Sequence, residues 1–172
     1  WTEFFNNYIN SVPGFGEVLL RLGCAMLVGL VIGTEREYTH RPAGMRTHIL
    51  VALGSCAVMI TGQMIFFEYK PYGGVPDPAR LAAQVITGVG FLGAGTILRE
   101  GANVKGLTTA AGIWATAGIG MAIGAGLYSI GICATVLILF AQIILHKNFR
   151  WIRIPRTKVL VIRDVTEEGF QE

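Results

Sequence analysis

The stretch that decides the fold is residues 106–145, GLTTAAGIWATAGIGMAIGAGLYSIGICATVLILFAQIIL, which contains no Asp, Glu, Lys or Arg. Its forty residues would form about 60 Å of helix. The hydrocarbon core of a bilayer is only about 30 Å thick. The stretch is therefore expected to cross a membrane twice, as helices 107–124 and 127–145, with a turn at Gly124-Ala125-Gly126.

Three further apolar stretches precede this one, at residues 15–33, 47–67 and 81–98. The composition agrees, because 52% of the 172 residues are hydrophobic and only 15% are charged, against about 25% charged in an ordinary soluble domain. The mean hydropathy is +0.54. The 23 glycines also fit, since glycine is frequent in transmembrane helices. The sequence predicts an all-α fold, a polytopic membrane protein with a bundle of five transmembrane helices in residues 1–146.

Residues 147–172 have a different character. The run from Thr157 to Arg163 has a β-branched core between polar ends, which is typical of a short strand. One strand is not stable alone. The segment is expected to be a cytoplasmic tail whose strand either pairs with another chain or loop, or begins a truncated α/β domain.

Basic residues are divided unequally between the two sides of the predicted bundle. Eleven of the fourteen Lys and Arg fall on one side, two fall on the other, and Arg21 lies inside the first span. Short cytoplasmic loops are rich in Lys and Arg. The protein is therefore expected in a plasma membrane, with its amino terminus outside and its carboxyl terminus in the cytoplasm. The eleven are Arg36, Arg41, Arg46, Arg99, Lys105, Lys147, Arg150, Arg153, Arg156, Lys158 and Arg163.

Small and polar residues recur every three or four positions along three predicted helices. In a bilayer such residues mark the helix faces that contact protein, so all three faces are expected to turn toward other helices. The stripes are Arg80, Gln84, Thr87, Gly88, Phe91 and Gly95; His48, Ala52, Ser55, Met59, Gly62 and Gln63; and Thr109, Gly112, Thr116, Gly120 and Gly124. The last helix is poorer in such residues and is expected at the periphery, against lipid.

Glycines are expected to bring helices close together. The pattern GxxxG occurs at Gly29 to Gly33 and at Gly120 to Gly124, and either pair would also support a homodimer. Contacts within the bundle are the favoured interpretation. Further packing glycines are expected at Gly88, Gly90, Gly93 and Gly95. The G-x-G-x-x-G that begins at Gly88 lies inside a membrane span, which excludes a dinucleotide site.

Arg21 is costly inside a span, at roughly 2.5 to 3.5 kcal/mol. Either Glu17, four residues earlier on the same face, neutralises its charge, or Arg21 meets an acid from another span, for which Asp77 is the candidate. Asp77 followed by Pro78 is equally an ordinary helix start. The hypothesis for the outer side is a functional polar cluster of Arg21, Asp77, Arg80, Gln84 and Glu17.

A second polar cluster is predicted on the cytoplasmic side, where Arg46 is expected to need a carboxylate such as that of Glu35. Thr108 or Thr109 would also cap the fourth helix as well as any hydroxyl. The members of this cluster are Glu35, Arg36, Arg46, Thr47, Thr108 and Thr109.

No pair of residues suggests enzymatic chemistry. His48 and Ser55 share a helix face but are about 10 Å apart along it, which is too far for a base and a nucleophile. No His or Cys spacing indicates zinc or haem. We therefore expect no enzyme, no cofactor, no metal site and no nucleic-acid partner.

Several motifs in register resemble the bacterial MgtC/SapB family over roughly residues 15–145. They are Gly29-Leu30-Val31-Ile32-Gly33-Thr34-Glu35-Arg36, Ala43-Gly44-Met45-Arg46-Thr47, Asp77-Pro78-Ala79-Arg80-Leu81-Ala82-Ala83-Gln84, Gly88-Val89-Gly90-Phe91-Leu92-Gly93-Ala94-Gly95 and Gly106-Leu107-Thr108-Thr109-Ala110-Ala111. The resemblance implies an inner-membrane protein with five spans, linked to growth under low magnesium, to acid stress or to survival inside host cells. It also implies a regulatory role, including restraint of the F-type ATP synthase.

Two functions therefore remain. In the first, the protein is a regulator whose spans dock against partner helices, because two acids beside two arginines on the outer side make a poor cation site. In the second, it is a transporter or channel for protons or divalent cations such as magnesium, because ionisable residues inside a membrane are functional suspects. The first is favoured.

Overall fold

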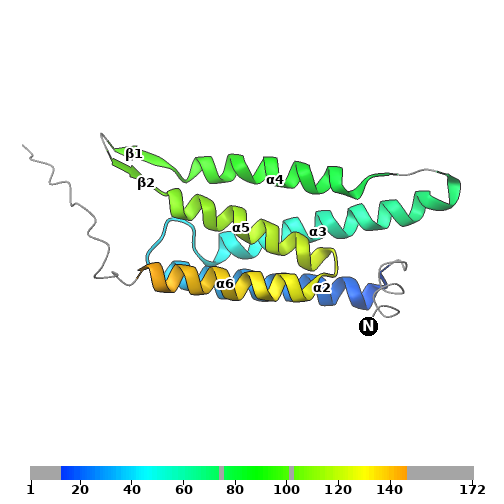
Figure 1. Ribbon diagram of the computed structural model, residues 1–172, viewed down its shortest axis with the longest axis horizontal. Helices are drawn as coiled ribbons and strands as arrows, with labels where there is room; N and C mark the ends of the chain where they lie inside the picture. Colours follow the sequence, from blue (N-terminus) through cyan, green and yellow to red (C-terminus); the bar gives the residue numbers. More distant parts are fainter. Residues whose placement is uncertain (1–12, 74–75, 101–102, 147–172) are drawn as a thin grey trace, which may run out of the picture.

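The computed structural model describes residues 13–73, 76–100 and 103–146, and these form five α-helices with one small hairpin (Figure 1). The predicted strand at 157–163 lies outside the described residues. In chain order the elements are α2 (Phe15–Tyr38), α3 (Met45–Tyr69), the 3-10 turn η1 (Lys70–Tyr72), α4 (Pro78–Gly95), β1 (Leu98–Glu100), β2 (Asn103–Lys105), α5 (Leu107–Gly124) and α6 (Tyr128–His146). The all-α membrane fold is confirmed.

The five helices run up and down along one long axis, so each end of the bundle gathers segments that are distant in sequence (Figure 1). We call one end the hairpin end: α2 and α6 finish there, α3 and α5 begin there, and the β1–β2 hairpin lies beside them. The other end, which holds the start of α2 and the turn from α5 to α6, is called the Arg21 end.

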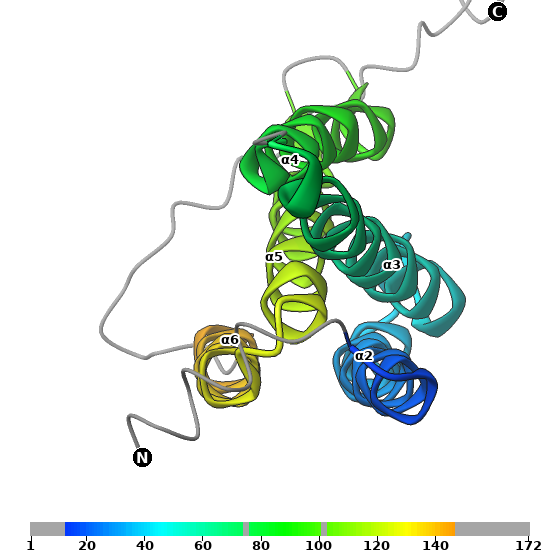
Figure 2. The ribbon, with the colours of Figure 1, turned by 90° about the vertical axis from the view of Figure 1, so that its right-hand side faces the viewer.

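Helix α5 is the central element. It contacts all four other helices, and viewed end-on it lies between α4 on one side and the separate pair α2 and α6 on the other (Figure 2). One apolar core joins α2, α3 and α5 through residues such as Ile32, Cys56 and Ile123, and a second joins α4 to α5 through Val89 and Ile113. Because α2 and α6 touch each other little, the space between them opens onto α5.

Three helices are long and apolar enough to cross a membrane: α2, α5 and the helical segment Met45–Tyr72. The apolar part of α6, Tyr128–Ile144, is shorter. Both α4 and α6 lie along these three over most of their length (Figure 1). Large apolar side chains of α6 face outward, with Leu137 66% and Phe140 61% exposed, as expected for a peripheral helix against lipid.

The glycines of the two GxxxG patterns lie against neighbouring helices. A Cβ on Gly29 would lie 2.7 Å from the Cα of Ile49, and one on Gly33 would lie 2.5 Å from the Cα of Met45. A Cβ on Gly124 would likewise lie 2.5 Å from the carbonyl oxygen of Cys56, and Gly120 is equally tight against α3. Only glycine allows these backbones to approach so closely, and each contact lies within one chain.

The hairpin is a feature that the apolar pattern did not reveal. The third span was expected to continue to Leu98, but α4 ends at Gly95 and Leu98 pairs with Lys105 in an antiparallel ladder. The chain then turns into α5 through Gly106, whose φ is +92°. A Cβ at Gly106 would collide with the carbonyl oxygen of Thr96, so this turn requires glycine.

The predicted faces of α3 and α5 are turned inward, but that of α4 is not. All five stripe residues of α5 are buried, as are four of the six on α3. On α4 the stripe lies on the other side of the helix: Val89 and Gly93 lie against α5 and Leu81 lies against Gly62 of α3, whereas Phe91 is 82% exposed. The whole stripe of Arg80, Gln84, Thr87, Gly88, Phe91 and Gly95 is exposed.

Candidate functional site

Arg21 joins three helices at the Arg21 end of the bundle. Its side chain is only 2% exposed and forms an ion pair with Glu17, one turn earlier on α2. One guanidinium nitrogen, Nη1, donates to the side-chain oxygen of Gln63 on α3 at 2.6 Å and to the carbonyl oxygen of Gly124 on α5 at 2.7 Å. The charge is therefore neutralised within its own helix, while the remaining donors hold two neighbours.

Gln63 completes this cluster, and it was not among the predicted site residues. Its amide nitrogen donates to the carbonyl oxygen of Ala125 at 3.1 Å while its oxygen accepts from Arg21. The two carbonyls at Gly124 and Ala125 lie at the end of α5, where helical carbonyls have no partner within the helix. A polar residue in an otherwise apolar stretch was the signal that would have identified Gln63.

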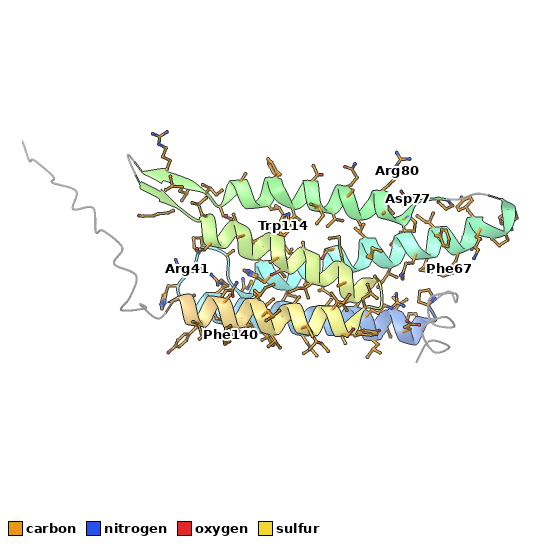
Figure 3. The ribbon with its side chains drawn as sticks, in the orientation of Figure 1. Arg41, Phe67, Asp77, Arg80, Trp114 and Phe140 are labelled. Carbon is orange, nitrogen blue, oxygen red and sulfur yellow. The ribbon has the colours of Figure 1, made fainter. Side chains whose placement is uncertain are left out.

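The other predicted members of the outer cluster lie elsewhere. Asp77 is exposed and caps α4, accepting a hydrogen bond from the amide of Ala79 at 2.9 Å. Arg80 and Gln84 are exposed on the outward face of α4, and Arg80 projects away from the bundle (Figure 3). The acid that pairs with Arg21 is thus Glu17 rather than Asp77.

A polar cavity of about 320 Å³ opens at the hairpin end between α2, α5 and α6. Polar side chains of α2 and of the following loop form one wall. The α5 and α6 walls are mostly small or apolar, with Thr108 and Gln142 as their polar members. Its lining residues are Glu35, Arg36, Thr39, Arg41, Thr108, Ala111, Gly112, Ala115, Ile138, Ala141 and Gln142. Arg41 lies at this end of the molecule (Figure 3).

Arg36 is the most buried charge of the cavity. Its side chain is 5% exposed, and its Nε lies 2.9 Å from a carboxylate oxygen of Glu35. Among the described residues, neither this Nε nor the carboxylate oxygen Oε2 of Glu35 has a partner with hydrogen-bond geometry. Both residues lie in the last turns of α2, which continues to Tyr38 rather than ending near Gly33.

The remaining members of the predicted cytoplasmic cluster divide into two groups. Arg46 and Thr47 are exposed at the start of α3 and do not line the cavity, so the expected pairing of Arg46 with Glu35 is wrong. Thr108 lines the cavity, whereas Thr109 is buried with a hydroxyl that has no hydrogen-bond partner among the described residues. Neither threonine caps α5, because the N-cap is Gly106.

Gln142 lines the cavity, and His48 lies beside Gly112 outside the cavity lining; the predictions included neither in the site. His48 is fully buried, and its Nδ1 lies 2.9 Å from the carbonyl oxygen of Gly44. That carbonyl is an acceptor, so Nδ1 carries the hydrogen and Nε2 of the neutral ring is an acceptor. Neither Nε2 of His48 nor Oε1 of Gln142 has a partner among the described residues. Gly112 separates them: its Cβ would lie 3.6 Å from a side-chain nitrogen of each.

The two polar sites differ in chemistry. The Arg21 cluster has its donors and acceptors paired, so it is suited to holding helices together. The cavity at the hairpin end has two arginines against one glutamate and keeps buried polar atoms without partners, which is a feature of binding sites. In the residues that the structure describes, no three His, Cys, Asp or Glu gather closely enough to hold a metal ion.

Comparison with known proteins identifies the family. The model of the MgtC family matches residues 22–151. Escherichia coli (strain K12) has a relative named "Putative magnesium transporter YhiD", which is 46% identical over 132 residues, 76% of this chain and 61% of its own. Protein MgtC of Salmonella typhimurium (strain LT2) is 48% identical over 130 residues, 75% of this chain and 52% of its own. Protein SapB of Bacillus subtilis (strain 168) is 46% identical over 127 residues, 73% of this chain and 55% of its own.

The chain thus spans between about half and three fifths of the length of these relatives. None of the three names is that of an enzyme. No solved structure matches. The matched region contains both polar sites except for Glu17 and Arg21. With three quarters of the chain aligned at this level of identity, this protein belongs to the MgtC family.

Proposed function

We propose that this protein is a non-enzymatic regulator in the bacterial inner membrane, acting in adaptation to low magnesium or to acid or intracellular stress. It acts by docking against a helix of a partner membrane protein. Its hairpin end faces the cytoplasm, because the basic residues of the connecting segments gather there. The amino terminus is then outside.

The observation that carries this proposal is the outward face of α4. Apolar surface does not drive helices together in a bilayer, so small and polar residues mark contacts with protein. On α4 these residues are exposed, and no atom lies within 4 Å of a Cβ position at Gly90 or Gly95. Gly88 is as open but borders a pocket beside α3. Nothing within the described chain uses this face, which favours a helix from outside it.

The Arg21 cluster supports a docking role over a conducting one. A path for cations along the bundle would pass a buried guanidinium at one end and the two arginines of the cavity at the other. Positive charges at both ends raise the energy of a cation there. The hydrogen bonds of Arg21 to α3 and α5 instead keep these helices in one arrangement, which is what a rigid docking platform needs.

The resemblance to the MgtC/SapB family makes the F-type ATP synthase the first partner to test. A photo-crosslinking amino acid placed at Thr87, on the outward face of α4, should give an adduct with a membrane subunit of that enzyme in cells grown at low magnesium. The matched control position is Leu137 on α6. Its side chain is also exposed but lies among Ile, Leu and Val, and it should give no adduct.

Two results would contradict this account. Equal adducts from Thr87 and Leu137 would mean that the face of α4 has no selectivity. An adduct of twice the chain's mass from Thr87 would assign the face to a homodimer instead of a partner protein.

Transport of protons or magnesium is the second candidate function. It is favoured by the name of the Escherichia coli relative and by the cavity at the hairpin end. Flux into proteoliposomes under imposed magnesium and proton gradients tests it. Flux above empty vesicles that is lost in Arg21→Ala, with folding checked by circular dichroism, would replace the docking proposal. Equal leakage from protein-containing and empty vesicles would support docking.

A further inference from the structure

The outer part of the cavity at the hairpin end offers hydrogen-bond donors, and the inner part offers a hydrogen-bond acceptor. We propose that this cavity binds a phosphate ester that carries a free hydroxyl. The proposal goes beyond the proposed function and does not rest on it, because the cavity and the outward face of α4 are separate surfaces.

The outer part is suited to a phosphate. Arg36 lines the cavity and is buried, and its Nε has no hydrogen-bond partner among the described residues. A planar guanidinium presents its donors in a fork that matches two oxygens of a phosphate. Arg41 adds a second positive charge and Thr108 a hydroxyl, while Glu35 contributes the only negative charge among the lining side chains. The balance favours an anion.

The ends of three helices lie at the cavity, and their dipoles favour charges of opposite sign. Thr108 lies in the first turn of α5, whose amide groups no side chain caps, and a helix amino terminus attracts anions. The carboxyl ends of α2 and α6 lie at the same cavity and act in the opposite direction. The two arginines therefore decide the sign of the ligand, and the helix ends do not.

The inner part is suited to a hydroxyl. Among the described residues, Oε1 of Gln142 is a lining atom without a hydrogen-bond partner. It is an acceptor, so an anion alone would leave it unsatisfied. Nε2 of His48, behind Gly112, is a second acceptor without a partner in the described chain. Both side chains lie beside the space that a side chain of Gly112 would fill, and Gly112 lines the cavity. A hydroxyl of the ligand would donate its hydrogen to Oε1 of Gln142 while its phosphate meets Arg36.

Two sources offer this chemistry. One is a membrane lipid with a glycerol phosphate headgroup, which the apolar lining by Ala115, Ile138 and Ala141 would accommodate. The other is a soluble ester such as glycerol 3-phosphate. The two sources are separated by using phosphatidylglycerol as the lipid probe and glycerol 3-phosphate as the soluble probe. Phosphatidic acid and inorganic phosphate, measured as the ionised phosphates, serve as matched probes without an alcohol hydroxyl.

Gly112→Ala is the sharpest variant. The added methyl would lie at ordinary contact distance, 3.6 Å, from both His48 and Gln142, so it fills the inner part without a clash. Alanine also favours a helix over glycine by up to about 1 kcal/mol, so the variant should be at least as stable as the wild type. Gly118→Ala on the same helix, where nothing lies within 4 Å, is the matched control.

Binding is measured in two ways with the full chain. Native mass spectrometry from detergent micelles compares retention of phosphatidylglycerol and phosphatidic acid. Calorimetry in phosphatidylcholine nanodiscs compares glycerol 3-phosphate and inorganic phosphate. We expect one hydroxyl-bearing probe to bind at least tenfold more tightly than its matched probe. Gly112→Ala should abolish this preference, Arg36→Lys should weaken all binding at least tenfold, and Gly118→Ala should behave as wild type.

Three results would overturn the proposal. The first is that neither source binds to protein whose thermal unfolding shows it to be folded. The second is equal binding by all four proteins, which would mean adventitious association only. The third is binding of magnesium alone that Arg36→Lys strengthens, which would assign the cavity to a cation.

Discussion

Replacing Gln63 tests whether the Arg21 cluster holds the bundle together. Gln63→Met keeps the length of the side chain but removes the acceptor for Arg21 at 2.6 Å and the donor to Ala125 at 3.1 Å. The charge-assisted bond is worth about 1.5 kcal/mol, at the low end of its aqueous range, because helices separated in a bilayer find other partners. The neutral bond adds about 0.6 kcal/mol. We expect a loss of about 2 kcal/mol in the free energy of unfolding.

The assay is reversible unfolding in mixed micelles with increasing dodecyl sulfate, followed by circular dichroism. Thr61→Ala is the matched control on the same helix, because Thr61 is exposed and its hydroxyl bonds only within α3, to the carbonyl of Ala57. That change should stay within about 0.5 kcal/mol of wild type. If Gln63→Met falls within the same limit, the hydrogen bonds of Gln63 do not stabilise the bundle and the reasoning is wrong.

A second substitution separates charge from hydrogen bonding. Gln63→Glu supplies Arg21 with a carboxylate in place of an amide oxygen but cannot donate to Ala125 when ionised. We expect it to be more stable than Gln63→Met, since an attraction to the guanidinium replaces the lost acceptor. Equal destabilisation by both substitutions would show that the Arg21 charge is already fully compensated by Glu17.

Three further predictions concern the amino-terminal cap of α4, the contacts between helices and the membrane topology. Asp77→Ala should cost about 1 kcal/mol in the same assay and Asp77→Asn well under that, because asparagine also caps a helix; equal losses would contradict a capping role. Gly33→Ala should cost at least about 1 to 3 kcal/mol, because a Cβ would lie 2.5 Å from the backbone of Met45. Gly90→Ala, with open space around it, should be neutral or stabilising. A cysteine placed at Val104 in the hairpin should react with a membrane-impermeant maleimide only in inverted vesicles, and labelling of intact cells would reverse the proposed orientation.

The candidate sites were partly within reach of the sequence. Arg21 stood out because a charge inside an apolar span is costly, and Glu17 was one of its two predicted partners. Gln63 and the end of α5 were not assigned to it, because residues 42 and 103 positions away in sequence become neighbours only when helices pack. At the hairpin end the pattern identified Glu35, Arg36 and Thr108, but the cavity also needed Gln142 from the far end of the chain.

The sequence by itself determined the all-α membrane class and the five helices of the described residues. It could do so because length, apolarity and the glycine and proline signals act within single segments. The tertiary structure decided the direction in which the small and polar face of each helix points. The stripes of α3 and α5 face inward and that of α4 faces outward, although all three have the same period. Periodicity tells which residues share a face, but the direction of that face depends on the helices packed around it, and these come from elsewhere in the chain.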